Sequence, residues 1–161
     1  NYIKPRKVVR AVYVGRVSAE KNLEAFLQIN NKDIVKCVIG DGPQLDEYKQ
    51  KYPQTSFFGR KSHEEIAKLL QTMDVFAWPS MTDTFGLVVL EAMAVGLPVA
   101  AYHNPVNDYI IENMKSGFLT KDDLELAITG ANLLKPQDAI ARAKQFSWEA
   151  ATKQFLENQK L

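Results

Sequence analysis

Residues 75–102 read VFAWPSMTDTFGLVVLEAMAVGLPVAAY, and this stretch indicates the fold of the chain. Two short apolar segments, Val75–Trp78 and Pro98–Tyr102, have the length of β-strands. Between them lies a helix-length run, Phe85–Val95, in which all but two residues are apolar. We therefore expect a strand, a helix and a second strand, with the helix buried because it is apolar all round.

The same alternation continues along the rest of the chain. Further strand-like segments are Val8–Val14, Val35–Ile39 and Ser56–Phe58, and a short extended segment is Gly117–Leu119. The other segments with helical spacing are Leu23–Ile29, Gln44–Tyr52, Glu64–Leu70, a helix near Asn107–Met114, and a helical tail from Asp122 onward. The strands are continuously apolar, as in a parallel sheet covered on both faces. We predict an α/β fold with a doubly wound parallel sheet and a helical C-terminal tail.

The length and composition limit the number of domains and the class of function. The 161 residues suit one domain with a core, which we place at residues 8–161, after a basic, proline-containing linker end at residues 1–7. The chain begins at Asn1, which suggests a piece of a longer protein. The net charge of +1 argues against general nucleic-acid binding. Cys37, the only cysteine, is expected to be a core thiol. There is no signal peptide and no transmembrane run, so we expect a cytoplasmic location.

Two acidic residues mark the first candidate site. Glu91 lies inside the apolar helical run, where a carboxylate has a large desolvation cost unless it is paired. Asp83 precedes the same helix, where free backbone N–H groups gather. Asp83 could instead be only an N-cap, and Glu91 could pair with a buried lysine or arginine. Together around Gly86, the two acids favour a ligand site.

Two cations mark the second candidate site, in the loop after the first predicted strand. Ser18 or Asn22 can cap the helix that follows, and either choice leaves Lys21 in or beside its first turn. With Arg16, this places two positive charges at an already positive helix end, which favours a bound phosphate. The alternative is that both are surface charges, or partners of Glu20 and Glu24.

The remaining loops carry weaker signals. Gly40-Asp-Gly-Pro43 predicts a tight turn before a helix. Ser62 and Glu65 form a capping box, so His63 is expected to be an ordinary first-turn residue. His103 follows the fifth predicted strand and is more often a structural residue than a base. No Asp-x-Asp pair, metal-ligand spacing, Gly-x-Gly-x-x-Gly or P-loop motif occurs, so no metal or other cofactor is expected.

The chain resembles a known family through motifs in a fixed order. They are Gly15-Arg16, Glu20-Lys21, Gly40-Asp-Gly-Pro43, Phe58-Gly59, Pro79-Ser80, Asp83-Thr-Phe-Gly86, Glu91-Ala-Met-Ala94, Gly96-Leu-Pro-Val99 and Phe146-Ser-Trp148. Through them it is similar to the C-terminal, donor-binding half of a retaining GT-B glycosyltransferase of family 4, the group 1 glycosyl transferases. The resemblance runs from about Val8 to Phe155 and implies a Rossmann-like half of the GT-B fold.

The resemblance also implies roles for individual residues. Arg16 and Lys21 would stabilise the departing nucleoside diphosphate, and Asp83 would lie beside the donor sugar, so these three are the expected catalytic residues. Glu91 would hold the ribose hydroxyls. The other expected substrate-binding residues are Gly15, the strand exit Gly59, Arg60 and Lys61, and the helix start Thr84, Phe85, Gly86 and Leu87. Two departures from the family pattern are Asp83, where glutamate is common, and Asn104-Pro105, where Gly-Gly is common.

The implied function is transfer of a hexosyl unit from a UDP- or GDP-sugar to a glycan or lipid acceptor. The acceptor-binding N-terminal domain would then be missing, and this chain would be inactive alone. Its partners would be that domain, the nucleotide-sugar and the acceptor, with a peripheral membrane location through the missing domain as an option. Two alternatives stay open: a non-catalytic binding subunit of a split transferase, and a nucleotide-sugar epimerase with His103 as the candidate acid or base.

Overall fold

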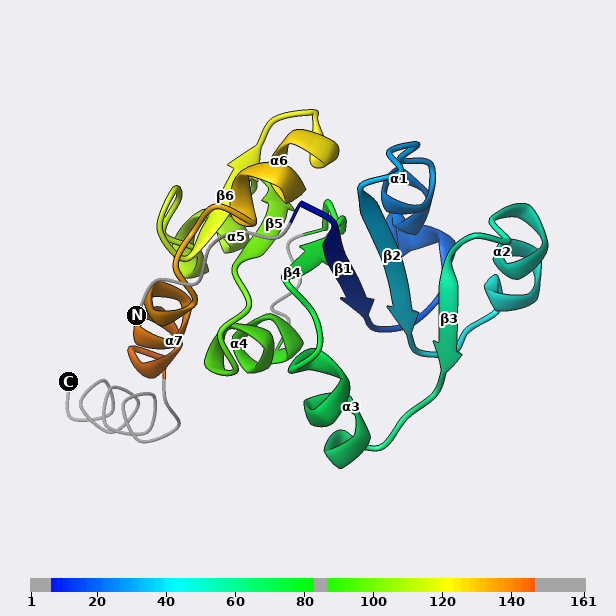
Figure 1. Cartoon of the computed structure of the whole chain (residues 1–161), viewed down its shortest axis with the longest axis horizontal. Coiled ribbons are helices and arrows are strands. Elements are labelled where there is room, and N and C mark those ends of the chain that lie inside the picture. Colours follow the sequence, from blue (N-terminus) through cyan, green and yellow to red (C-terminus); the bar gives the residue numbers. More distant parts are fainter. Residues whose placement is uncertain (1–6, 83–86, 147–161) are drawn as a thin grey trace, which may run out of the picture.

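The computed structural model describes residues 7–82 and 87–146, which form a six-stranded parallel sheet flanked by helices (Figure 1). The strand order is β3-β2-β1-β4-β5-β6. The strands are β1 Val9–Val14, β2 Ile34–Ile39, β3 Ser56–Gly59, β4 Val75–Trp78, β5 Val99–Tyr102 and β6 Gly117–Thr120. All five neighbouring pairs are parallel. The predicted α/β parallel sheet is therefore confirmed.

Helices cover both faces of this sheet. They are α1 Leu23–Leu27, α2 Leu45–Lys51, α3 His63–Leu70, α4 Leu87–Ala94, α5 Pro105–Ile110, α6 Leu124–Ala131 and α7 Pro136–Lys144, with a short 3-10 helix η1 at Ala19–Lys21. Helix α6 contacts β4, β5, β6 and α1, whereas α4 contacts β4 and β5 and packs against α7. Figure 1 shows α6 and α4 on opposite sides of β5. The helical tail predicted from Asp122 is confirmed as α6 and α7 within the described residues.

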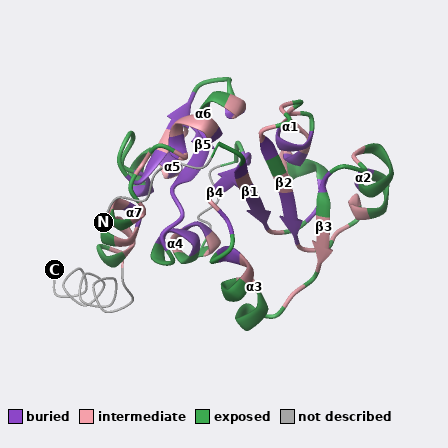
Figure 2. Ribbon diagram, viewed as in Figure 1, coloured by how far each residue is buried: buried purple, intermediate pink, exposed green. Residues whose placement is uncertain are grey.

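The core lies between the central strands and these helices. Every residue of β4 and β5 is buried, and the purple segments of Figure 2 follow the same strands. Tyr13, Phe26 and Phe76 are among the largest fully buried side chains. Burial of an apolar side chain of this size contributes about 1.5–3 kcal/mol. Cys37 is also buried, as predicted, and burial raises the pKa of its thiol.

Two predictions about helices are corrected by the structure, one in its boundaries and one in its burial. The helix expected near Asn107–Met114 begins at Pro105 and ends at Ile110. The Asn104 side chain accepts a hydrogen bond from the Asn107 N–H at 2.8 Å, and proline is favoured in a first turn, so the cap and the proline set the start. Met114 has a φ of 68°, which a helix does not allow.

Helix α4 is not buried all round, contrary to prediction. Val89, Ala92 and Met93 are buried, but Leu87 is 66% exposed and the Glu91 side chain is 45% exposed. The reason is geometric, since α4 lies on the outside of the sheet and contacts other elements over only part of its circumference. An apolar run does not by itself show which of its sides another element will cover.

Candidate functional site

The strand order reverses between β1 and β4. From β1 the chain continues to β2 on one side, and from β4 it continues to β5 on the other. Ligands of doubly wound folds bind at such a switch point, beyond the carboxyl ends of the strands. The two loops that leave it are joined here, because Asn22 Nδ2 donates a hydrogen bond to the Pro79 carbonyl oxygen at 3.0 Å.

The loop after β1 is held by hydrogen bonds along its backbone. The Gly15 N–H donates to Ile39 O at 3.0 Å, and the Val17 N–H donates to Asp41 O at 3.0 Å. The hydroxyl of Tyr13 donates to Arg16 O at 2.8 Å. The loop that carries Arg16 therefore has a defined main-chain path over the ends of β1 and β2.

The predicted tight turn at Gly40–Pro43 also packs against this loop, which the sequence did not indicate. A Cβ atom added at Gly40 would lie 1.9 Å from Gly15 O, and one added at Gly42 would lie 2.2 Å from Val17 O. Real Cβ atoms do not approach a carbonyl oxygen so closely. Both glycines are therefore needed for contact between two backbones.

The two predicted cations occupy different positions in the loop. Arg16 is exposed, and its Nε lies 3.9 Å from Glu20 Oε1. This is the alternative ion pair named above, but both side chains are 62% exposed and such a pair holds weakly. Lys21 is the last residue of η1, two residues before α1 begins. It therefore lies beside the first helical turn, as predicted.

The predicted side-chain cap for this helix is wrong. Ser18 occupies the N-cap position of η1 and Asn22 that of α1, but neither side chain caps its helix with a hydrogen bond. Asn22 adopts a left-handed conformation with φ of 55°. Its amide is thereby directed to Pro79 and joins two loops instead of satisfying one helix end.

A pocket of about 360 Å³ opens beside this loop, at the carboxyl ends of β1, β2 and β3. It is lined by Val14, Gly15, Arg16, Ile39, Gly40, Asp41, Arg60, Lys61 and Ile66. Three of these residues are cationic and one is acidic. Four predicted site residues thus meet here although they come from two loops: Gly15, Arg16, Arg60 and Lys61. A cationic pocket of this kind suits an anionic ligand.

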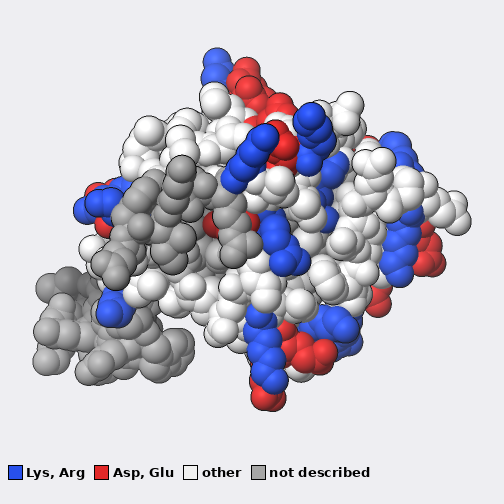
Figure 3. Space-filling model, viewed as in Figure 1, with Lys and Arg blue, Asp and Glu red and all other residues white. Residues whose placement is uncertain are grey.

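The strand exit after β3 supplies the second wall of the pocket. Gly59 accepts a hydrogen bond from the Gly40 N–H at 2.8 Å and has a φ of 71°. The capping box of Ser62 and Glu65 is confirmed, with both of its hydrogen bonds present. The capping box fixes the start of α3 at its N-cap Ser62, the residue after Lys61. The main chain beside this cation is therefore anchored to the helix. Figure 3 shows basic and acidic side chains side by side over α3.

Glu91 lies on α4, facing the start of α3. Its Oε2 is 4.0 Å from Nδ1 of His63. The expected burial of Glu91 is wrong, since its carboxylate is open to solvent and accessible to a ligand. His63 is the first residue of α3, as predicted, but its proximity to Glu91 depends on how α3 and α4 pack. No spacing in the sequence could have indicated it.

Part of the predicted site lies outside the described residues: Asp83, Thr84, Phe85 and Gly86. Leu87 is the first described residue of α4 and is exposed. At the end of β5, Nδ1 of His103 lies 2.8 Å from Oδ1 of Asp108, and the backbone N–H of His103 donates a hydrogen bond to Thr120 O. His103 is therefore tied to α5 and β6 as well as to β5.

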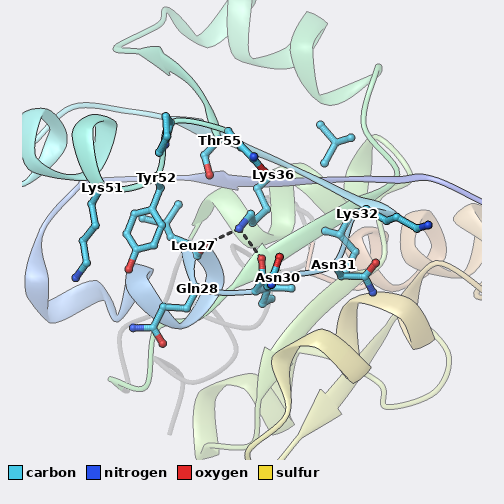
Figure 4. Close-up of a pocket in the computed structure, with 14 residues that line it drawn as sticks. Leu27, Gln28, Asn30, Asn31, Lys32, Lys36, Lys51, Tyr52 and Thr55 are labelled. Atoms are coloured by element: carbon cyan, nitrogen blue, oxygen red, sulfur yellow. Dashed lines mark hydrogen bonds between the residues drawn. The ribbon is translucent and has the colours of Figure 1, made fainter.

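A second pocket, of about 550 Å³, lies at the opposite edge of the sheet, around the start of β2 and the ends of α1 and α2 (Figure 4). Its central cation, Lys36, donates hydrogen bonds to Leu27 O and Ile29 O at 2.5 and 2.6 Å. Desolvation lowers the pKa of Lys36. Lys51 is 3.2 Å from Glu24. Because these two lysines have internal partners and Lys36 satisfies carbonyls at the end of α1, we regard this pocket as structural.

Within residues 7–82 and 87–146, no group of three or more His, Cys, Asp or Glu side chains could hold a metal ion. In the same part of the chain, no helix is long and apolar enough to cross a membrane.

Comparison with known proteins places these features in context. The family model described as "Glycosyl transferases group 1" matches residues 2–145. The sulfoquinovosyl transferase SQD2 of Arabidopsis thaliana is 34% identical over 158 residues, covering 88% of this chain and 31% of that protein. An alpha-monoglucosyldiacylglycerol synthase of Streptococcus pneumoniae is 32% identical over 126 residues, covering 71% of this chain and 29% of that protein. The chain thus spans about a third of the length of these relatives.

Solved structures share the fold. Anabaena Alr3699/HepE in complex with UDP-glucose superposes with a TM-score of 0.74 at 24% identity, covering 95% of this chain and 49% of that one. Sucrose-phosphate synthase from Thermosynechococcus elongatus superposes with a TM-score of 0.78 at 25% identity, covering 95% of this chain and 45% of that one. In both cases this chain corresponds to about half of the larger molecule.

Proposed function

Because the chain belongs to the group 1 glycosyl transferases and has the fold of a GT-B C-terminal domain, we propose that it binds the nucleotide-sugar donor of a retaining hexosyltransferase. The donor would be a UDP- or GDP-sugar and the acceptor a glycan or lipid. The observation that carries the proposal is the pocket at the ends of β1, β2 and β3, where Arg16, Arg60 and Lys61 converge. The Anabaena protein with a similar fold has UDP-glucose as its ligand.

In this proposal the chain contributes electrostatic stabilisation and orientation. Arg16 and Lys21 stabilise the charge that grows on the diphosphate as the glycosidic bond breaks. Their effect is largest when they are already in place before the reaction, and the backbone bonds of Gly15 and Val17 restrain the loop that carries Arg16. The main chain at Gly59–Lys61 contacts the base. Glu91 accepts hydrogen bonds from the ribose hydroxyls, for which its exposed carboxylate is available.

The residues from Asp83 to Leu87 complete the proposed site. Asp83 would orient the donor sugar, and the amides of residues 84–87 would face the sugar and the β-phosphate. No metal takes part in this scheme, since Arg16 and Lys21 supply the positive charge. A second domain carries the acceptor, so the chain alone forms no sugar product. Incubation of the chain with a bound donor and a panel of lipid and sugar acceptors tests that statement, and product at ordinary enzyme rates would contradict it.

Calorimetry with UDP, GDP, ADP and their sugars tests the proposed function. We expect at least one of them to bind, with the same affinity in the presence of a chelator. Arg16→Gln should weaken that binding, whereas Lys49→Gln, a matched change on the exposed surface of α2, should not. Absence of binding by every nucleotide would overturn the proposal, and binding abolished by the chelator would overturn its metal-free form.

A further inference from the structure

The peptide unit between Arg16 and Val17 is held from both sides. Its carbonyl group, that of Arg16, accepts the Tyr13 hydroxyl at 2.8 Å. Its N–H group, that of Val17, donates to Asp41 O at 3.0 Å. A peptide plane with both polar groups engaged cannot rotate without breaking a hydrogen bond. The main chain at Arg16 is therefore restrained by β1 on one side and by the turn after β2 on the other.

Tyr13 is itself held tightly in the core. Its side chain is fully buried, and its ring stacks on Trp78 with a centroid distance of 5.7 Å and an interplanar angle of 16°. Tyr13 belongs to β1 and Trp78 to β4, so the ring lies at the switch point. Burial raises the pKa of Tyr13 far above its ordinary value, so the hydroxyl stays protonated and remains a donor.

The adjacent glycine shows that the hydroxyl fills a defined space. A Cβ atom added at Gly15 would lie 2.7 Å from the Tyr13 oxygen. The loop thus passes directly over the phenol group, and only glycine permits this approach. The hydroxyl, and not merely the ring, supports the first residues after β1.

We propose that Tyr13 is a positioning residue for the diphosphate-binding site: its hydroxyl fixes the main chain of Arg16 and so holds that side chain at the pocket. This inference rests on the proposed function. The Arg16 side chain is exposed, and its ion pair with Glu20 is long at 3.9 Å, so its position depends mainly on its backbone. A preorganised loop binds its ligand more tightly because less freedom is lost on binding. Tyr13 itself touches no substrate in this scheme.

The test compares Tyr13→Phe with the matched variant Tyr52→Phe, in titrations of each variant with UDP and with uridine. Tyr52 also donates its hydroxyl, to Glu24 Oε2 at 3.2 Å, but it lines the pocket at the opposite edge. Tyr13→Phe should bind UDP roughly 3- to 10-fold more weakly, the effect of one net hydrogen bond. Its affinity for uridine should stay within about twofold of the unchanged chain, and Tyr52→Phe should alter neither affinity. GDP with guanosine replaces this pair if the unchanged chain prefers GDP.

The outcomes separate three cases. A loss confined to the diphosphate supports the inference, whereas an equal loss for UDP and uridine, or no loss, overturns it. If the unchanged chain binds no nucleoside diphosphate, the proposed function fails instead. Hydrogen exchange at the Val17 amide then still tests the hydroxyl's effect on the loop. Faster exchange in Tyr13→Phe than in Tyr52→Phe supports that effect, and unchanged exchange overturns it.

Discussion

Asn22 and Pro79 are joined across the switch point of the sheet by a hydrogen bond of 3.0 Å, although 57 residues separate them in the chain. The donor is the Asn22 side chain, which a left-handed backbone with φ of 55° turns away from its own helix. The acceptor is the first residue after β4. The loop with Arg16 and Lys21 is thereby joined to the start of the segment that follows β4.

Substitution of Asn22 tests this link. Asn22→Gly keeps the left-handed backbone and removes the hydrogen bond, so we expect unfolding free energy to fall by about 1 kcal/mol. Asn22→Ala removes the same hydrogen bond but, unlike glycine or asparagine, alanine is strained in a left-handed conformation. Relative to the glycine variant we therefore expect a further loss of roughly 1–2 kcal/mol. Urea denaturation measures both changes. Equal stability of the alanine and glycine variants would show that the backbone conformation is not as described.

Substitution of Gly40, in the turn after β2, tests whether the backbone of this turn touches the backbone at Gly15. Gly40→Ala places a Cβ atom 1.9 Å from Gly15 O. We expect a loss of roughly 3 kcal/mol or more, because overpacking adds to backbone strain. Gly59→Ala is the matched control, since its φ is 71° but no atom lies within 4 Å of the added Cβ. It should lose only about 1–2 kcal/mol, and a Gly40 variant no less stable than this control would contradict the packing.

Substitution of Glu91 tests the proposed contact between its carboxylate and the ribose hydroxyls. Glu91→Gln should weaken nucleotide binding by roughly 1.5–3 kcal/mol, the range for a hydrogen bond to a charged group. Because the carboxylate is exposed, the unfolding free energy should change by less than about 0.5 kcal/mol. Glu64→Gln is the control, on the exposed side of α3. A clearly lowered unfolding free energy of the Glu91 variant with unchanged nucleotide affinity would indicate a structural role.

The ion pair between Glu24 and Lys51 should make the stability of the fold depend on pH. The hydrogen bond from Lys51 and, less strongly, that from Tyr52 lower the pKa of Glu24. A lowered acid pKa stabilises the fold above the unfolded value of about 4.3, and this contribution is lost as the pH falls through the folded value. Glu24→Gln should therefore lower stability by less than about 1 kcal/mol at pH 7, since the pair is partly solvated. The difference from the unchanged chain should disappear at low pH, and a difference that grows on acidification would have the wrong sign.

The α/β sheet was predictable because its strands are short, continuously apolar and separated by helical segments. Val75–Trp78 was predicted with the boundaries that β4 has. The capping box at Ser62 was equally predictable, since its partner Glu65 lies three residues away and the interaction is local. The boundaries of α5 were not predicted, because the capping of Asn104 competed with an apolar pattern that continued beyond Ile110.

By itself, the sequence determined the type and order of most elements of this protein, because apolar periodicity acts over a few residues, but it did not determine all of their boundaries. It also indicated that Arg16 and Lys21 lie in the loop after the first strand and that Glu91 lies in the apolar helix. Only the tertiary structure decided that Arg16 meets Arg60 and Lys61 in one pocket, that Glu91 is exposed beside His63, and that Tyr13 supports the loop. These relations join residues of different strands and helices. They depend on strand order and helix packing, which no pattern within a single segment contains.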